Sequence, residues 1–208
     1  MNNPENNKAR IALKALELFI MYGIRRVSMN EIALSMGMSK KTIYIHYHDK
    51  EALVTEVVRV VLDKNFESCE TNKENASNAI HESFLAIDQT ADLFRRMNPI
   101  IMHDLEKYYP KAYNAFRDYK NEFLFETLRQ NIQKGVTEGF YRDDFNIDLI
   151  VRFRLRTVME VFSPEIYLHT NMALGKIHEE LFYNFLFSLA TPKGYKLIDT
   201  YRKERNKI

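Results

Sequence analysis

The fold of this chain is decided by residues 10–53, which read RIALKALELFIMYGIRRVSMNEIALSMGMSKKTIYIHYHDKEAL. Apolar residues in this stretch recur every three or four positions, which is the spacing of an amphipathic helix. Gly23 and Gly37 interrupt the pattern, and glycine is the residue that most often ends a helix. The stretch therefore predicts three short helices and the start of a fourth.

Polar capping residues mark where these helices begin. Ser28 and Glu31 form a capping box, in which each side chain accepts a hydrogen bond from the other residue's backbone amide. Ser39 and Asp49 belong to the residue types preferred at the N-cap. We expect the helices at about 7–22, 28–37, 39–46 and 49–68.

The second and third of these helices have the spacing of a helix-turn-helix. Gly37 lies where the chain must reverse within about three to four residues, and a Cβ atom would strain such a turn. Ala33 is small where the two helices approach each other. In this motif the second helix enters the major groove of DNA, so residues 39–46 are expected to be the recognition helix.

The recognition helix carries side chains suited to DNA. Lysines such as Lys40 and Lys41 can donate to guanine edges or neutralise phosphates, and a threonine can contact a base or the backbone. His46 and His48 are two positions apart and do not share a helix face, so we expect no metal site and no cofactor. The expected DNA-binding residues are Ser28, Ser39, Lys40, Lys41, Thr42, Tyr44, His46 and Lys50.

The remainder of the chain is also helical in pattern, with no sustained alternation of the kind that strands show. We expect further helices at about 78–96, 99–107, 110–135, 146–168 and 173–190, with Pro164 ending or kinking the fourth of them. The fold class is therefore all-α, with a three-helix head joined by a long helix to a helical body. The expected domains are a DNA-binding domain at 7–53, an effector-binding and dimerisation domain at 54–192, and a basic C-terminal tail at 193–208.

The net charge of +2 is unevenly distributed along the chain. Residues 1–53 carry 8 Lys and Arg against 5 Asp and Glu, whereas residues 54–192 carry 16 against 21. A basic head on an acidic body indicates that only the head meets a polyanion. The sequence shows no membrane span, no secretion signal and a single cysteine, Cys69, so we expect a cytoplasmic protein.

Residues 10–53 resemble the DNA-binding domain of the TetR family of bacterial regulators. The matching features are an apolar first helix ending in "LF" and "YG", the capped start "SMNEIA", the turn "MGMS", and "TIYIHYHDKEAL". Two later stretches, "DLEKYYPKAYNAF" and "GVTEGFYRDD", look like segments found in one branch of that family. The resemblance implies a homodimer whose heads bind DNA and whose bodies bind a ligand and each other.

The resemblance also implies a role for each residue of the head. Ser28, Thr42, Tyr44, His46 and Lys50 match positions that meet the DNA backbone, and Lys40 and Lys41 match positions that contact bases. The chain departs from the family pattern at two places. Lys41 stands where glycine is frequent, which adds charge and affects base preference, and Tyr47 replaces a phenylalanine, so its hydroxyl needs a partner or solvent.

The body is rich in aromatic residues and methionine, which suggests a ligand pocket. Each such residue is more often ordinary core than a ligand contact. Arg154 and Arg156 lie among apolar residues, and an inward-pointing arginine would select an acidic or polar ligand, although a surface ion pair is the default. The expected pocket residues are Phe84, Met97, Met102, His103, Phe116, Tyr119, Phe123, Phe153 and Met159.

The helix at 173–190 is apolar around most of its circumference, so it must bury two faces. One face would pack on its own body and the other, together with the helix at 146–168, on a second copy of the chain. The expected dimer-interface residues are Leu174, Ile177, Leu181, Phe182, Phe185, Leu186 and Leu189.

These features predict a ligand-responsive transcriptional repressor that binds a near-palindromic DNA operator as a homodimer, with an unidentified small-molecule effector. The alternative is an effector-independent architectural or cell-division protein, whose body would be packed solid. An enzyme is not indicated, because the sequence lacks GxGxxG, the P-loop, CxxC and the second histidine of HExxH.

Overall fold

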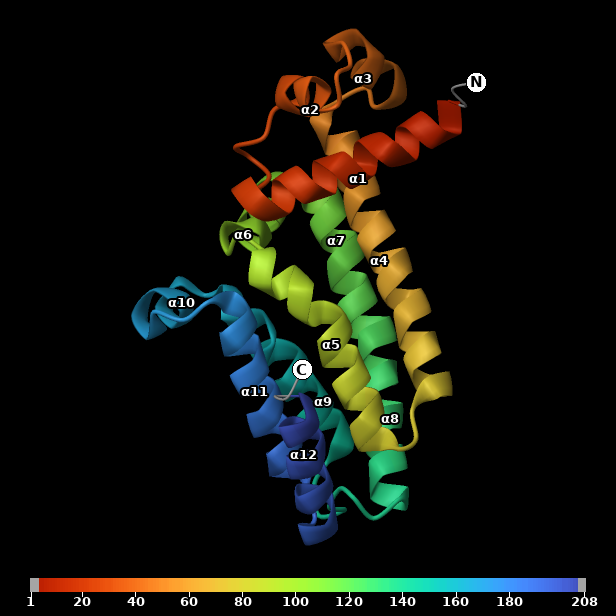
Figure 1. Ribbon diagram of the computed structural model, residues 1–208, viewed down its shortest axis with the longest axis vertical. Helices are drawn as coiled ribbons and strands as arrows, with labels where there is room; N and C mark the ends of the chain where they lie inside the picture. Colours follow the sequence, from red (N-terminus) through yellow and green to blue (C-terminus); the bar gives the residue numbers. More distant parts are fainter. Residues whose placement is uncertain (1–3, 206–208) are drawn as a thin grey trace. The chain divides into compact units, whose positions relative to one another are not determined.

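A computed structural model describes residues 4–205 of the chain, with side chains from residue 7 onward, and this range contains helices but no strand (Figure 1). The expected all-α class is confirmed. One isolated antiparallel bridge joins Tyr141 to Ala190. Among the described helices, none has both the length and the apolar character needed to cross a membrane.

The first four helices lie where the sequence predicts them. They are α1 (Pro4–Tyr22), α2 (Met29–Ser35), α3 (Lys40–His46) and α4 (Lys50–Asn75), the last of which extends beyond its expected end. Gly23 and Gly37 have φ values of 84° and 64°, a region that favours glycine. Both therefore terminate a helix as the sequence indicated.

The predicted caps form as expected. The Ser28 hydroxyl accepts a hydrogen bond from the Glu31 amide at 3.2 Å, and the Glu31 carboxylate accepts one from the Ser28 amide at 2.6 Å. The Ser39 hydroxyl accepts from the Thr42 amide at 3.1 Å, and the Asp49 carboxylate accepts from the Ala52 amide at 2.7 Å. Losing such a cap typically costs about 1 kcal/mol.

The later helices follow the expected ranges but are more interrupted. The predicted helix at 110–135 contains a π-helical turn, and the one at 146–168 breaks near Thr157 and restarts at Pro164, which lacks the amide that helix continuation requires. The elements are α5 (Ala79–Arg96), α6 (Ile100–Tyr108), α7 (Pro110–Tyr119), η1 (Lys120–Leu124), α8 (Phe125–Thr137), α9 (Ile147–Thr157), η2 (Met159–Phe162), α10 (Pro164–Thr170), α11 (Leu174–Leu189) and α12 (Pro192–Arg205).

The chain folds into two compact units. Of the described residues, unit 1 contains 4–65 and 96–119, and unit 2 contains 66–95 and 120–205. The helical head thus shares its unit with α6 and α7, which come from the middle of the chain. The functional division into domains 7–53, 54–192 and 193–208 stays a prediction.

Unit 2 has an aromatic-rich core formed by α5, α8, α9, α11 and α12. Phe84 packs edge-on against Phe182, with ring centres 5.5 Å apart, and Ile132 and Leu186 are buried beside them. Full burial of each such side chain contributes about 1.5–3 kcal/mol. This core fixes the positions of α9 and α11 within the unit.

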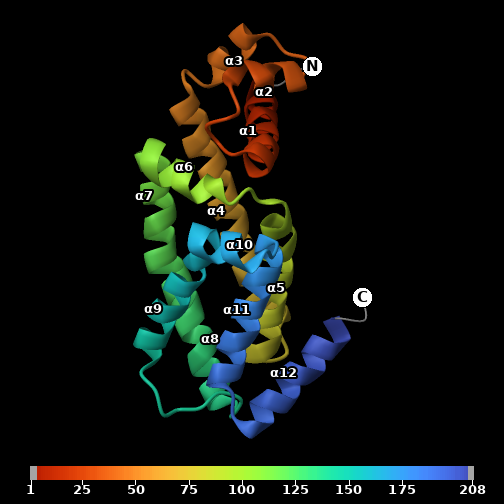
Figure 2. The same cartoon turned by 90° about the vertical axis from the view of Figure 1, so that its left-hand side faces the viewer.

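The segment expected to be a basic tail is instead the helix α12, so that expectation is corrected. Ile198 is completely buried, and the Arg205 guanidinium donates hydrogen bonds to Glu179 at 2.6 Å and to the Tyr183 hydroxyl at 3.1 Å. Figure 2 shows α12 lying beside α11. Residues 206–208 of the predicted tail lie outside the described residues.

Candidate nucleic-acid interface

The helix α3 is held in unit 1 by two apolar anchors. Ile43 is completely buried, and Tyr47, just after the helix, is 3% exposed. The Tyr47 hydroxyl donates a hydrogen bond to the Lys8 carbonyl oxygen at 3.0 Å, which is the partner that this position requires. Burial, together with the nearby charge of Glu56, raises the pKa of Tyr47 to about 12. These anchors fix which side of α3 faces outward.

The outward side of α3 presents two rows of side chains. Lys40 and Tyr44 form one row, and the Lys40 ammonium lies 5.6 Å from the centre of the Tyr44 ring. Lys41 and Ile45 form the other row, since residues four apart are neighbours on a helix surface. Tyr44 is 41% exposed and Ile45 is 72% exposed. We call these four residues the α3 outer face.

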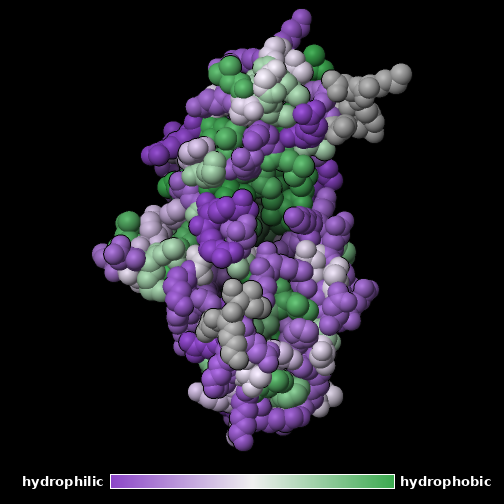
Figure 3. Space-filling view, viewed as in Figure 1, coloured by the Kyte–Doolittle hydropathy of each residue, from purple (hydrophilic) through white to green (hydrophobic). Residues whose placement is uncertain are grey.

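The sequence did not indicate Ile45 as a site residue, because an isoleucine in a helix is normally read as core. Its 72% exposure, and the 70% exposure of Leu34 on α2, place apolar side chains on the outside of the helix-turn-helix. Figure 3 shows hydrophobic residues at the surface over α2 and α3, among hydrophilic ones. An apolar side chain in this position can contact the methyl group of thymine.

The other predicted DNA-binding residues take different environments. The hydroxyls of Ser39 and Thr42 lie 2.8 Å apart at the start of α3, with Ser39 exposed and Thr42 half-buried. Ser28 is exposed within its capping box, and His46 is half-buried at the end of α3. All four lie in the same unit as the α3 outer face, and their contact with DNA stays a prediction.

Lys50 is engaged within the protein. Its ammonium donates hydrogen bonds to the carbonyl oxygens of Ile24 at 2.6 Å and Arg25 at 3.4 Å, and lies 5.9 Å from the rings of Phe19 and Tyr109. Burial lowers its pKa, an effect that Asp104 and Glu31 oppose. In this geometry Lys50 fixes the turn between α1 and α2, a role that the sequence did not indicate.

The same turn is fastened to α6 inside unit 1. Asp104, which is 4% exposed, accepts a hydrogen bond from the Arg25 amide at 2.9 Å. The Asn98 amide donates to the Ile20 carbonyl at 2.7 Å, and a Cβ atom at Gly23 would meet the Ile100 side chain. A shift of α6 would therefore act directly on the position of α1 and α2.

The predicted pocket residues are divided between the two units. Phe84 belongs to the unit 2 core, and most of the others are half-buried. Two of the nine do not fit an enclosed pocket, which corrects their assignment: Phe153 is 62% exposed, and His103 is exposed as well. Both lie on outward faces of their helices, α9 and α6. The remaining assignments stay predictions.

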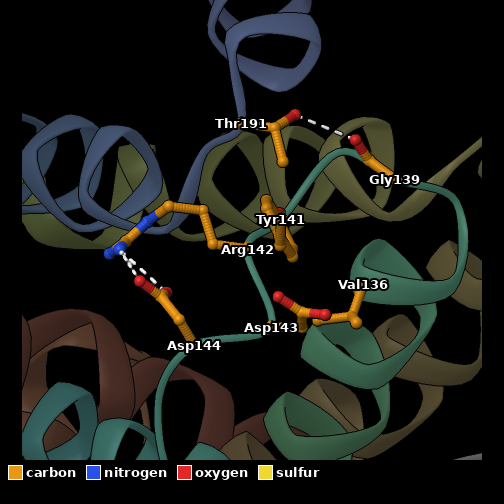
Figure 4. Close-up of a pocket in the computed structure, with 7 residues that line it drawn as sticks. All are labelled: Val136, Gly139, Tyr141, Arg142, Asp143, Asp144 and Thr191. Atoms are coloured by element: carbon orange, nitrogen blue, oxygen red, sulfur yellow. Dashed lines mark hydrogen bonds and ion pairs between the residues drawn. The ribbon is translucent and has the colours of Figure 1, made fainter.

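A hollow of about 410 Å³ opens in unit 2 at the loop between α8 and α9 (Figure 4). Three of its polar side chains are paired: Arg142 contacts Asp144 at 2.8 Å, and the Thr191 hydroxyl donates to the Gly139 carbonyl at 2.9 Å. The Tyr141 hydroxyl, by contrast, is buried without a hydrogen-bond partner. The hollow is lined by Val136, Gly139, Tyr141, Arg142, Asp143, Asp144 and Thr191.

The predicted dimer-interface residues are mostly used inside one chain. Leu174, Ile177, Phe182, Leu186 and Leu189 are each buried, with exposures of 6% or less. Because unit 2 covers them, they cannot form the outer surface that faces a partner, which corrects that part of the expectation. Leu181 and Phe185 are only half-buried, and they stay available.

Two inward-facing polar residues of unit 2 stand apart from the apolar core. Arg154 on α9 is 8% exposed, and His178 on α11 is 6% exposed. The imidazole of His178 stacks on the Phe94 ring, with centres 4.0 Å apart and an angle of 1° between the planes. Burial, followed by the charges of Arg154 and Arg205, lowers the pKa of His178 to about 4, so the imidazole is neutral near pH 7.

This histidine is expected to destabilise the fold in mild acid. Its pKa is lower in the folded state than its ordinary value of about 6.5, so the unfolded chain binds the proton more readily. The contribution of neutral His178 to the free energy of unfolding is therefore fully present above about pH 6.5. It is lost as the pH falls toward 4, which lowers the free energy of unfolding by about 3 kcal/mol. Urea unfolding at pH 7 and at pH 4 measures how much the free energy of unfolding drops between the two. We expect this drop to be smaller by about that amount in His178→Gln than in the wild-type chain. An equal drop in both proteins would contradict the assignment.

Several known proteins are similar to this chain in sequence. Residues 11–57 match the family model described as bacterial regulatory proteins, tetR family. The HTH-type transcriptional repressor KstR2 of Mycolicibacterium smegmatis is 25% identical over 160 residues, covering 73% of this chain and 76% of that protein. The HTH-type transcriptional regulator YvaF of Bacillus subtilis is 24% identical over 161 residues, covering 74% and 80%.

Solved structures agree on the fold. A transcriptional regulator of the TetR family from Agrobacterium tumefaciens superposes with a TM-score of 0.74, covering 91% of this chain and 100% of that one at 14% sequence identity. At this level of identity the likeness concerns the course of the helices. It includes both the head and the helical body of the chain described above.

Proposed function

The chain belongs to the TetR family of bacterial regulatory proteins and is a DNA-binding transcriptional regulator, and from this premise we propose that it is a ligand-responsive repressor. It acts as a homodimer on a near-palindromic operator, in the cytoplasm. The observation that carries the proposal is the α3 outer face, where Lys40, Lys41, Tyr44 and Ile45 project from a helix anchored by Ile43. The repressor role is supported by the name of the KstR2 relative.

The α3 outer face combines two kinds of DNA contact. The lysines supply charge that phosphates or guanine edges accept, and the Tyr44 ring and hydroxyl suit the sugar-phosphate backbone. Two copies of α3 would occupy successive major grooves, about 34–36 Å apart, in the manner of dimeric helix-turn-helix proteins. The operator is therefore expected to be a near-palindrome.

The homodimer is supported by exposed apolar residues on α9. Leu149 and Phe153 are 65% and 62% exposed, and their spacing of four places them on one side of the helix. On α11, Leu181 and Phe185 are half-buried and have the same spacing. Exposed apolar side chains in such a set are typical of an interface. We propose that these four residues form the dimer contact, in place of the buried residues of α11.

The response to ligand is proposed to pass through α6. Three helical stretches run from unit 2 into unit 1, namely α4, α5 with its continuation to α6, and α7 with η1. An effector that binds one conformation of the body better than another shifts the population toward it. The contact of Asp104 with the Arg25 amide then carries a shift of α6 to the turn between α1 and α2.

The experiment that tests this function is the selection of bound DNA from a genomic library with the purified full chain. The expected result is enrichment of fragments that share a near-palindrome, with the region upstream of the chain's own gene included in the library. Retention of all fragments alike, with affinity set only by salt, would favour the alternative of an architectural protein. The absence of any DNA binding would refute the proposal.

Ile45 is expected to contribute to base preference. Replacing Ile45 by alanine shortens an exposed side chain, so the fold should be unaffected, while a contact with a thymine methyl would be lost. We expect the selected operator to bind about tenfold more weakly and to become less selective for thymine at one position of each half-site. Leu34→Ala on α2 is the matched control. Unchanged selectivity in Ile45→Ala would remove this residue from the interface.

A further inference from the structure

Arg154 is a buried cation with few hydrogen-bond partners. Its side chain points into unit 2, whereas Arg156, two positions along α9, is exposed and pairs with Glu160 at 3.1 Å. One N–H of Arg154 donates to the Leu181 carbonyl oxygen at 3.3 Å, and the guanidinium carbon lies 5.0 Å from the centre of the Phe185 ring. A guanidinium has five N–H donors, so most of them are unused.

No carboxylate forms an ion pair with Arg154 among the residues that the structure describes. Burial alone lowers its pKa, to about 10, with no acidic group acting in the opposite direction. An isolated buried charge is unfavourable because it loses its hydration, which is why buried cations are normally paired. Arg154 thus makes an unfavourable contribution to the folding free energy of unit 2 that no ion pair offsets.

The surroundings of Arg154 suit an amphipathic anion. The charge of Arg154 acts on the neutral imidazole of His178, which stacks on Phe94, and Phe94 lies 5.7 Å from the Phe162 ring. Among the described residues, the one fully enclosed side-chain polar atom without a hydrogen-bond partner is Tyr141 Oη. No nitrogen of Arg154 is in that state. The unpaired N–H groups of Arg154 are therefore not completely enclosed by the protein.

We propose that Arg154 binds the carboxylate of a small effector whose apolar part lies among the aromatic residues of unit 2, with His178 as a hydrogen-bonding partner. The inference rests on the proposed function, in which a ligand controls DNA binding. It specifies the chemical class of that ligand. A charged pair of this kind, shielded from water, supplies both affinity and selection against uncharged analogues.

The test uses the full chain and three probes, hexanoate, decanoate and 3-phenylpropanoate, each compared with its primary amide by thermal unfolding and calorimetry. At least one carboxylate should raise Tm, while its amide binds at least tenfold more weakly. Arg154→Met should weaken that carboxylate by about 30-fold or more. Arg156→Met, the matched control on the same helix, should stay within twofold. Equal binding of acid and amide, or no stabilisation by any probe, overturns the proposal.

The ligand-free variants give a second measurement. Because Arg154 is unpaired, Arg154→Met should leave Tm unchanged or raise it, and Arg154→Lys should retain part of the carboxylate binding. A lowered Tm in Arg154→Met would mean that the guanidinium holds the fold. Conversion of that variant to a monomer would mean that a carboxylate of a second copy is the partner. Either outcome overturns the proposal.

The two proposals can fail separately. If the wild-type chain binds operator DNA but no carboxylate, the carboxylate site is wrong and the regulator stands. If it binds a carboxylate through Arg154 but no DNA, the proposed function fails and the binding site stands.

Discussion

Replacing Lys40 and Lys41 together by glutamate is expected to lower operator affinity by about 1,000-fold or more at moderate salt. Both ammonium groups lie on the α3 outer face, where a DNA surface would meet them first. The change removes two positive charges and adds two negative ones, so attraction to phosphates becomes repulsion. The helix should still form, because its anchors Ile43 and Tyr47 are untouched.

Single substitutions separate the two lysines. Lys40→Ala and Lys41→Ala, each measured by fluorescence anisotropy against salt concentration, distinguish phosphate contacts from base contacts. A lysine that meets a phosphate lowers the slope of the salt dependence by about 1 when it is removed, whereas one that meets a base changes the preferred sequence. We expect the second behaviour for Lys41. Lys196→Glu on α12 makes half of the double variant's change in net charge at an exposed position of unit 2 and serves as the control. A loss of affinity as large as in the double variant would contradict the assignment to α3.

The head was predictable because its signals are local. Ser28, Ser39 and Asp49 cap helices through backbone amides three residues away, so their sequence spacing is sufficient to place the helix starts. Gly23 and Gly37 adopt positive φ values for a reason that is equally local. The structure confirms each of these positions.

The roles that sequence could not assign depend on contacts between distant parts of the chain. Lys50 resembles a phosphate-binding residue in sequence, but its ammonium donates a hydrogen bond to the carbonyl oxygen of Ile24, 26 positions away. Asp104 fastens α6 to the Arg25 amide, 79 positions away. No pattern in the sequence predicts such a contact. The same holds for Ile45, whose exposure depends on which face of α3 is anchored by Ile43.

Periodicity also cannot tell which apolar face meets a second chain. The stripe on α11 has the spacing of an interface helix, yet most of it is buried inside unit 2, and Phe182, Leu186 and Leu189 belong to the core that α5, α8, α9 and α12 share. Residues 193–205 are rich in lysine and arginine, so their few apolar contacts, such as Ile198, were a weak signal. The apolar residues that remain accessible are Leu149 and Phe153 of α9, together with the half-buried Leu181 and Phe185 of α11.

Phe153→Glu is accordingly expected to convert the proposed dimer to a monomer, with the dimer dissociation constant raised by about 1,000-fold. Phe153 is 62% exposed in a single chain, so a glutamate there is solvated in the monomer and leaves the fold intact. In the dimer the same carboxylate would be stripped of water without a partner, and a buried unpaired charge costs about 3–5 kcal/mol. The change therefore acts on association alone.

Sedimentation or light scattering of the purified chain measures this directly, and Leu149→Glu, one helical turn away, should behave alike. Leu168→Glu on α10 is the matched control, since Leu168 is 66% exposed in the same unit. A monomer presents one α3 helix where the proposed near-palindromic operator would have two half-sites, so operator affinity should fall together with dimerisation. If Phe153→Glu stays dimeric while circular dichroism shows an unchanged fold, the face of α9 is not the interface, and the contact must lie elsewhere on the chain.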